Sequence, residues 1–289
     1  MAGIAIIGAS GRAGEALARR LLAQRYGVIA IGRSEARYRE LGLRAPFRRV
    51  DLSAPDSLAA ALADAEAVAV CVHARFLTSI LPALPPRLVR IVALGSTRKF
   101  TRFPDKAALA VREAEFVFEA AHLPGVMLHP TMIYGARAES NIQRVAAYIR
   151  RFGIVPLPGG GQSLVQPIHV DDVAACLEAA LVRPTAPGAS IVIAGPQAME
   201  YRDMVRAVGR AIGREARILS VPAPLLKTAA LLTPVIPGAP RVWPAEVRRL
   251  LEDKAFDIAE MQTRLGIVPM DFQTGLARTF RDQGGSRSS

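Results

Sequence analysis

The 289-residue chain is 51% hydrophobic and 21% charged, which favours a soluble globular protein with a large core over a disordered one. Its formal net charge of +12 comes largely from scattered arginines without interleaved aromatic residues, so a nucleic-acid partner is not favoured, although a contact with an anionic membrane surface stays open. Cys71 and Cys176 lack the spacing of a zinc site or a disulfide framework, so we expect no metal and two reduced core thiols in a cytoplasmic protein.

The first half of the chain alternates short apolar runs with amphipathic segments. Strands are predicted at 4–8, 28–32, 47–52, 67–72, 88–96 and 126–135, and helices at 12–24, 57–65 and 105–121. Continuous apolar runs separated by helices indicate βαβ units, and therefore an α/β fold with a Rossmann-type doubly wound parallel sheet. No basic lead-in precedes the first strand, so no secretory signal is expected.

The second half is less regular. Helices are predicted at 138–151, 171–181, 201–213 and 244–254, and strands at 191–195 and 217–222, with a loop-rich stretch over 152–172. We expect a dinucleotide-binding domain over 1–152, a smaller C-terminal α/β domain for substrate or partner over 153–282, and a flexible tail over 283–289. The strand at 191–195 is a candidate to return to the first domain.

The apolar segment 221–240 contains Lys227 and five prolines. It cannot form a clean membrane-spanning helix, because proline breaks the helical hydrogen-bond ladder. We expect a short helix followed by a loop that packs on the body or lines a pocket.

A glycine turn stands at the start of the chain. Gly8, Gly11 and Gly14 directly follow the first strand and open a helix. The first glycine allows a tight turn, the second lets backbone approach a pyrophosphate, and the third lets helix and strand pack closely. The free N–H groups of the helix start then favour the phosphates, so the pattern predicts a dinucleotide site.

The residues after the second strand favour NADP, with NAD as the alternative. NAD sites place an acid about 20 residues beyond the glycine turn to bind the ribose, whereas this chain has Arg33 and then Arg37 there. Arg12 adds a cation inside the turn, and arginine suits a 2′-phosphate. Asp51, just past the third strand, is placed to accept a hydrogen bond from the adenine amino group, or else caps its own turn.

Several motifs together resemble the short-chain dehydrogenase/reductase superfamily. GASGRAG (8–14), VDLS (50–53), LHPTMIYG (128–135) and QPIHVDDVA (166–174) are similar to its extended and atypical branches. Within these branches they resemble the NAD(P)-dependent epimerase/dehydratase group and the relatives of the complex I accessory subunit of this fold. The resemblance implies these cofactor-binding residues: Gly8, Ser10, Gly11, Arg12, Ala13, Gly14, Arg33, Arg37, Asp51, Leu52, Val72, His73 and Pro130.

The superfamily's usual Tyr-x-x-x-Lys pair is missing, because no tyrosine of the chain is followed by lysine four positions later. Three residues are candidates for proton transfer in its place: Tyr134 at the end of the sixth strand, His129 before Pro130, and His73 after the fourth strand. Ser96, after the fifth strand, lies where the resemblance places the family's serine and is a further catalytic candidate. For Tyr134 and His129 a purely structural role is the competing interpretation. His169 and Asp171 are expected to organise a helix start, and Gly159–Gly161 either cradles a substrate phosphate or forms a flexible crossover.

Two functions remain open from the sequence. One is an NADP-dependent oxidoreductase, epimerase or dehydratase acting on a small or nucleotide-linked substrate, with the cofactor carrying the difficult chemistry. The other is a non-catalytic NADP-binding regulator or accessory subunit, for which segment 221–240 and the positive charge would serve a protein complex or membrane surface.

Overall fold

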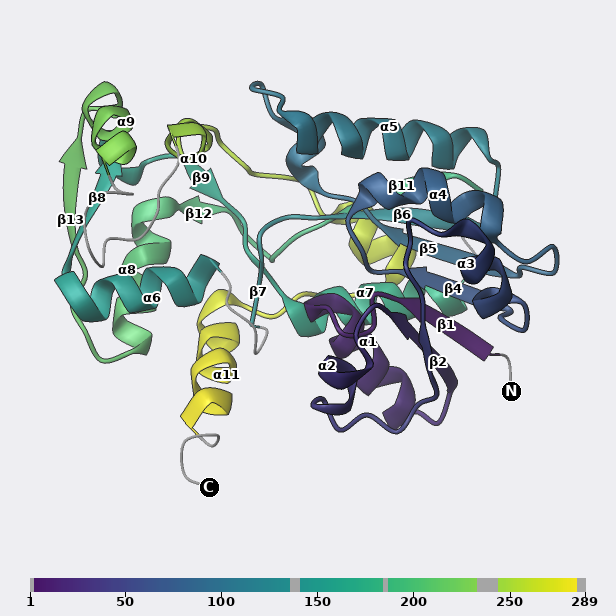
Figure 1. Cartoon of the computed structure of the whole chain (residues 1–289). Coiled ribbons are helices and arrows are strands. Elements are labelled where there is room, and N and C mark those ends of the chain that lie inside the picture. Colours follow the sequence, from purple (N-terminus) through teal and green to yellow (C-terminus); the bar gives the residue numbers. More distant parts are fainter. Residues whose placement is uncertain (1–2, 136–140, 184–186, 233–243, 285–289) are drawn as a thin grey trace.

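The computed structural model of the chain describes residues 3–135, 141–183, 187–232 and 244–284. A seven-stranded parallel sheet forms the larger part of the molecule (Figure 1). Its strands are β1 (Gly3–Ile7), β2 (Gly27–Gly32), β3 (Phe47–Arg49), β4 (Ala67–Val70), β5 (Arg90–Leu94), β6 (Gly125–Pro130) and β11 (Ala189–Ile193). They lie in the order β11-β6-β5-β4-β1-β2-β3, which confirms the predicted Rossmann-type doubly wound fold.

Both faces of this sheet are covered by helices (Figure 1). Along β1, Ile4 and Ile6 belong to one core cluster and Ala5 and Ile7 to the other, because successive side chains of a strand point to opposite faces. The first cluster lies against α1 (Arg12–Ala23) and α7 (Val170–Val182), and the second against α3 (Pro55–Leu62), α4 (Leu77–Ile80) and α5 (Lys106–Ala120). Burial on both sides explains why the strands are continuously apolar.

Local capping sets where the helices of the sheet begin. The Asp105 side chain accepts from the backbone N–H of Ala108 at 3.0 Å and caps α5. The His169 ring accepts from the N–H of Asp171 at 3.2 Å and caps α7, as expected for this residue. Each such cap is worth about 1 kcal/mol.

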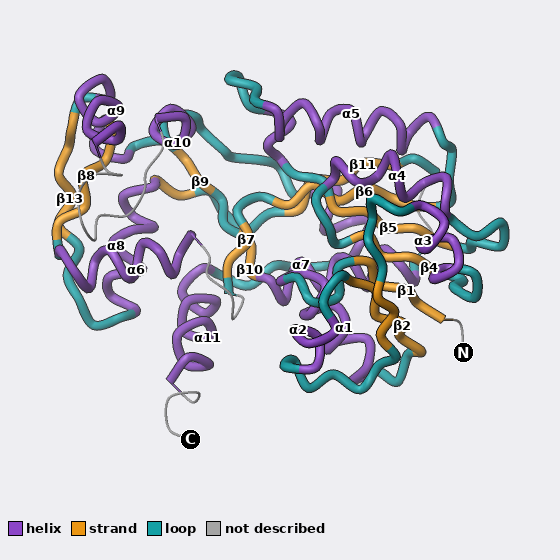
Figure 2. Tube along the Cα trace, viewed as in Figure 1, coloured by secondary structure: helices purple, strands orange, loops and turns teal. Residues whose placement is uncertain are grey.

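A smaller unit lies beside the sheet (Figure 2). It contains α6 (Asn141–Phe152), α8 (Tyr201–Ala211), α9 (Ala223–Leu232), α10 (Pro244–Arg249) and α11 (Phe272–Gly284), with the parallel pair β8 (Ile154–Pro158) and β13 (Arg217–Val221). Ile142 and Ile149 of α6 pack in one core with Met204 and Val208 of α8. Between β10 (Ile168–His169) and β12 (Met199–Glu200) the chain returns to the large sheet, where α7 packs on one face and β11 pairs with β6.

Two very short strand pairs each have one strand, β9 or β10, in the stretch expected to be loop-rich. They are β7 (Ile133–Tyr134) with β10 (Ile168–His169), and β9 (Leu164–Val165) with β12 (Met199–Glu200). The predicted strand at 126–135 thus divides into β6 and β7, and the helix predicted at 244–254 ends at Arg249. The helix α11 and the turns around α4 were not predicted.

The apolar segment 221–240 is described only in its first part. There α9 confirms the short helix, while residues 233–243 lie outside the described residues, as do 285–289 of the predicted tail. Among the described helices, none combines the length and apolar character needed to cross a bilayer. Cys71 and Cys176 are free thiols.

Candidate functional site

The glycine turn is built as closely as its sequence predicts. Gly8 has a φ of +88°, and its N–H donates to the Ile31 carbonyl oxygen at 2.8 Å. A Cβ atom at Gly14 would stand 2.2 Å from the Gly8 carbonyl oxygen, and one at Gly8 would stand 2.7 Å from Val72 Cγ1. Only glycine fits either position.

The start of α1 completes the cradle. Gly11 caps this helix without a side-chain hydrogen bond, so the first N–H groups of α1 are left for a ligand. Arg12, the first helical residue, is exposed. A backbone cradle with free donors at a helix N-terminus fits a pyrophosphate, and the residues present therefore suit a dinucleotide.

Exposed arginines follow β2, as predicted. Arg33 and Arg37 are both exposed. Asp51, beyond β3, accepts from the backbone N–H and the hydroxyl of Ser53 at 3.0 and 2.8 Å. These hydrogen bonds, and to a smaller degree the charge of Arg33, lower the pKa of the Asp51 carboxyl. The turn-capping role weighed for Asp51 is thus present, beside an arginine.

Other predicted cofactor residues lie on the same elements and at the same edge of the sheet. Val72 and His73 follow β4, and the buried Pro130 ends β6. His73 accepts from the N–H of Arg75 at 3.2 Å, and burial, Arg75 and Arg98 lower its pKa. Ala13, in the first turn of α1, and Leu52 are buried, whereas Ser10 is half-buried in the glycine turn. The carboxyl ends of parallel strands form the usual ligand crevice of open α/β sheets.

His129 is fully buried in a polar cluster. Its Nδ1 accepts from the Ser96 N–H at 3.2 Å, and its Nε2 lies 3.2 Å from Glu115 Oε1. These contacts require the hydrogen on Nε2. Glu115 also accepts from Lys99 and from the Ser190 hydroxyl. Burial raises the pKa of Glu115, but its three donors outweigh burial and lower it to about 2.

Tyr134 is 1% exposed and belongs to the core of the smaller unit. Its ring contacts those of His169 and Phe272 edge-on, with both centroid distances 5.1 Å. A Cβ at Gly275 of α11 would stand 1.9 Å from the Tyr134 hydroxyl oxygen, so the hydroxyl points toward that helix. Burial, followed by the charges of Asp172 and Asp271, raises the pKa of the phenol.

Replacing Tyr134 with phenylalanine is therefore expected to change cofactor turnover less than about two-fold, with a loss of stability of about 1 kcal/mol or less. The ring contacts survive, and the hydroxyl faces α11. Steady-state kinetics and urea unfolding of Y134F check this. A ten-fold fall in kcat at unchanged stability would instead make Tyr134 the proton donor.

Ser96 is more accessible than His129 and Tyr134, which are both buried. It follows β5, is half-buried, and its hydroxyl accepts from the N–H of Arg98 at 3.2 Å. This contact caps the short 3-10 helix η3 (Thr97–Phe100). Because the hydroxyl acts as acceptor there, its own hydrogen can be donated to a ligand oxygen.

The sequence did not predict the polar and charged clusters near the carboxyl ends of the strands. Lys99, Glu115 and Ser190 surround His129, and Arg98, Asp105, Arg249 and Lys254 form a second cluster. One sequence feature could have indicated the cluster around His129: Glu115 is a carboxylate next to Ala114, on the side of α5 that faces the sheet, where it is partly buried.

Comparisons with known proteins agree with this arrangement. Residues 8–114 match the family model described as NAD(P)H-binding. The chain is 26% identical over 145 residues to the mitochondrial NADH dehydrogenase (ubiquinone) 1 alpha subcomplex subunit 9 of Arabidopsis thaliana, which is 50% of this chain and 35% of that protein. The chain thus spans about a third of the length of this curated relative.

Solved structures resemble nearly the whole chain. A nucleoside-diphosphate-sugar epimerase from Pseudomonas aeruginosa has a TM-score of 0.76 at 20% identity, with 98% of both chains covered. The NADPH-dependent quinone oxidoreductase of Escherichia coli, complexed with NADPH, has a TM-score of 0.75 at 17% identity, covering 96% of this chain and 99% of that one. The family match includes the glycine turn, and the solved structures confirm the resemblance at the level of the fold.

Proposed function

We propose that the chain is an NADP-dependent oxidoreductase that transfers hydride between the cofactor and a small or nucleotide-linked carbonyl compound. The observation that carries this proposal is the glycine cradle combined with the exposed Arg33, which directly follows β2 where an NAD site places its acid, and the exposed Arg37 four residues later. An epimerase or dehydratase reaction would need the same hydride step. The nicotinamide ring supplies the hydride chemistry when the cofactor is bound.

In this proposal each part of the sheet edge has one task. The N–H groups of the glycine turn and the α1 start hold the pyrophosphate. Arg33 and Arg37 hold the 2′-phosphate through charge-assisted hydrogen bonds, together with Arg12 from within the glycine turn. The adenine side is formed by Asp51 and Leu52, and the nicotinamide side by Val72, His73 and Pro130.

In this proposal Ser96 donates a hydrogen bond to the substrate carbonyl oxygen, and solvent supplies the proton that the reduced oxygen takes up. Ser96 is half-buried at the carboxyl end of β5, whereas His129 and Tyr134 are buried. The His129 ring accepts the Ser96 N–H and so acts as a positioning residue for this turn. A serine without a neighbouring base is a weak acid, so the chain suits substrates whose reduction needs little protein assistance with protons.

Separate calorimetric titrations with NADPH and NADH test the cofactor assignment. We expect NADPH to bind at least about ten-fold more tightly, which corresponds to about 1.4 kcal/mol. R33Q should lose most of that preference while its NADH affinity stays unchanged. The control is R87Q. Arg87 is exposed and precedes β5, so it lies toward the amino-terminal ends of the strands, away from the proposed cofactor site.

A preference for NADH in the unmodified protein would contradict the role of Arg33. If R33Q and R87Q lost the preference for NADPH equally, the preference would come from the overall positive charge and not from a contact of Arg33. Binding of neither dinucleotide would make the glycine turn purely structural and overturn the proposal.

A second candidate function is a non-catalytic NADP-binding accessory subunit or regulator. It is favoured by the burial of His129 and Tyr134 and by the likeness to a complex I subunit. Turnover separates the two functions, because an enzyme oxidises NADPH with some carbonyl compound or quinone. An accessory protein retains NADPH unchanged through the same screen.

A further inference from the structure

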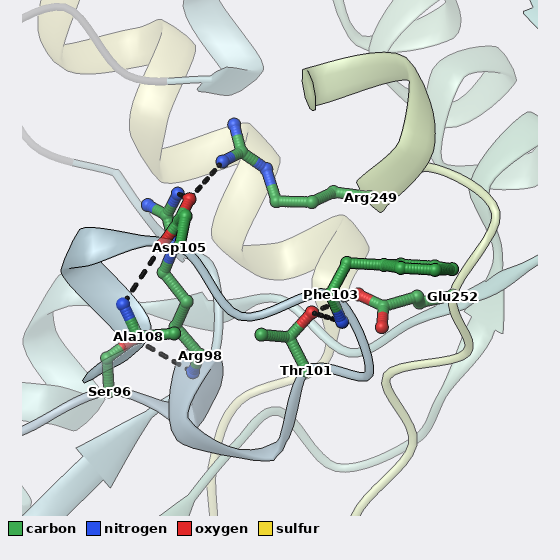
Figure 3. Close-up of polar contacts among 8 residues, drawn as sticks. All are labelled: Ser96, Arg98, Thr101, Phe103, Asp105, Ala108, Arg249 and Glu252. Carbon is green, nitrogen blue, oxygen red and sulfur yellow. Dashed lines mark hydrogen bonds and ion pairs between the residues drawn. The ribbon is translucent and has the colours of Figure 1, made fainter. Parts of the chain in front are cut away.

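A cluster of basic side chains lies beyond the carboxyl end of β5. Arg98 of η3 and Arg249 at the end of α10 both contact the same Asp105 carboxylate oxygen, the second at 3.3 Å. Figure 3 shows both guanidinium groups directed at this carboxylate, whose other oxygen caps α5 through Ala108. One acid is thus shared between two arginines from distant parts of the chain.

Lys254 adds a third positive charge to this cluster. Its Nζ donates to the Arg249 carbonyl oxygen at 2.7 Å. Burial lowers the pKa of Lys254, the charges of Arg249 and Arg98 lower it further, and Glu252 opposes them. The Glu252 carboxylate already accepts from the Thr101 hydroxyl at 2.7 Å and from the Arg102 N–H at 2.6 Å, as Figure 3 shows for Thr101.

One cation of the cluster has an unused donor. Arg98 shares its Asp105 oxygen with Arg249, and Glu252 is engaged with the neutral donors of Thr101 and Arg102. The Nε atom of Arg98 is buried and has no hydrogen-bond partner among the described residues. A buried donor without an acceptor costs about 1–3 kcal/mol, so an anion near Arg98 would stabilise this arrangement.

The cluster also lies where a substrate would be expected. Arg98 follows Ser96 by two residues. Its positive charge contributes to lowering the pKa of His73, which lies beyond the end of β4. Side chains of Arg98, Asp105 and Arg249 are 27–39% exposed, so the cluster is open to solvent. Ligands of open α/β sheets bind outside the carboxyl ends of the strands.

We propose that Arg98 and Lys254 bind an oxyanion group, a carboxylate or a phosphate, of the substrate. Arg98 would offer its unpaired Nε–H in a fork suited to an oxyanion, and Lys254 a point charge. This inference rests on the proposed function, since it gives the substrate class for the site beside Ser96. The contact of Arg98 and Arg249 with Asp105 holds the guanidinium group in place.

The lysine content makes the test direct, because the sequence has four lysines, Lys99, Lys106, Lys227 and Lys254. In protein with ¹³C-labelled lysine, each Cε signal follows the ionisation of its own amine, and K254R assigns the signal of Lys254. Protein saturated with NADPH is titrated with inorganic phosphate or malonate, against chloride at equal ionic strength.

We expect phosphate or malonate to raise the titration midpoint of Lys254 by about 1 unit, as an opposite charge within a few ångströms does. The midpoint of the exposed Lys106 should not move. R98Q should abolish the shift, whereas R102Q, at an exposed neighbouring arginine, should keep it. A response to malonate alone identifies a carboxylate substrate, and a response to phosphate alone a phosphorylated one.

Absence of a shift with both anions overturns the proposal. A shift seen only without NADPH also overturns it, because the cofactor's own phosphates would then occupy the cluster. A shift in protein that binds no dinucleotide would leave the oxyanion site standing and remove the proposed function instead.

Discussion

Replacing Gly14 with alanine is expected to abolish measurable NADPH binding. The new Cβ atom would stand 2.2 Å from the Gly8 carbonyl oxygen, 2.8 Å from Gly8 C and 3.0 Å from Ala9 Cα. These are backbone atoms, which cannot rotate away, so the first turn of α1 must move off the glycine turn. That movement displaces the N–H groups proposed to hold the pyrophosphate.

We expect at least a 100-fold loss of NADPH affinity, about 2.7 kcal/mol, and a loss of stability of about 1–3 kcal/mol from overpacking. Calorimetry and urea unfolding measure the two effects. The control is G3A at the opposite end of β1, where the new Cβ would meet its nearest atoms at 3.4 Å. If G14A bound NADPH as tightly as G3A, the glycine cradle would not be the cofactor site.

The sheet was predictable because its signals are local. Each strand is an apolar run buried on both faces. Each glycine of the turn after β1 meets one geometric requirement, such as a tight turn or close helix–strand packing. The strand at 191–195 was visible for the same reason, and it returns to β6. By contrast, α4 lies in a stretch rich in proline, and α11 carries Gly275 in its interior, where helix propensity is low.

The site was predictable only where backbone geometry defines it. Gly8, Gly11 and Gly14 define their turn within seven residues, whereas the side-chain partners of His129 come from η3 and α5, and Ser190 of β11 contacts those partners. Likewise, Asp105 and Arg249 are separated by 144 positions. Charged pairs of this kind depend on which elements the fold brings together, so the spacing of the residues in the sequence does not predict them. Of the two roles that the sequence left open for His129 and Tyr134, burial favours the structural one.

Removing the charge of Glu115 is expected to have the largest effect on stability. In E115Q, the Lys99 side chain, 12% exposed, loses its anionic partner, and the neutral amide is a weaker acceptor for His129 and Ser190. Breaking a buried ion pair by removing one partner costs about 3–5 kcal/mol. Urea unfolding at pH 7 measures the loss, with E113Q as the matched control, since Glu113 lies on the exposed face of the same helix.

The pH dependence follows from the pKa of Glu115, which is lowered to about 2 in the folded protein from about 4.3 in an unfolded chain. A carboxyl with a lowered folded pKa stabilises the protein above its unfolded pKa, and this contribution is lost as the pH falls toward the folded pKa. The wild type and E113Q should therefore lose up to about 3 kcal/mol more than E115Q between pH 5 and pH 2. Parallel losses in all three proteins would mean that Glu115 is not held ionised by its donors. Equal stability of E115Q and E113Q at pH 7 would mean that the cluster around His129 does not stabilise the fold.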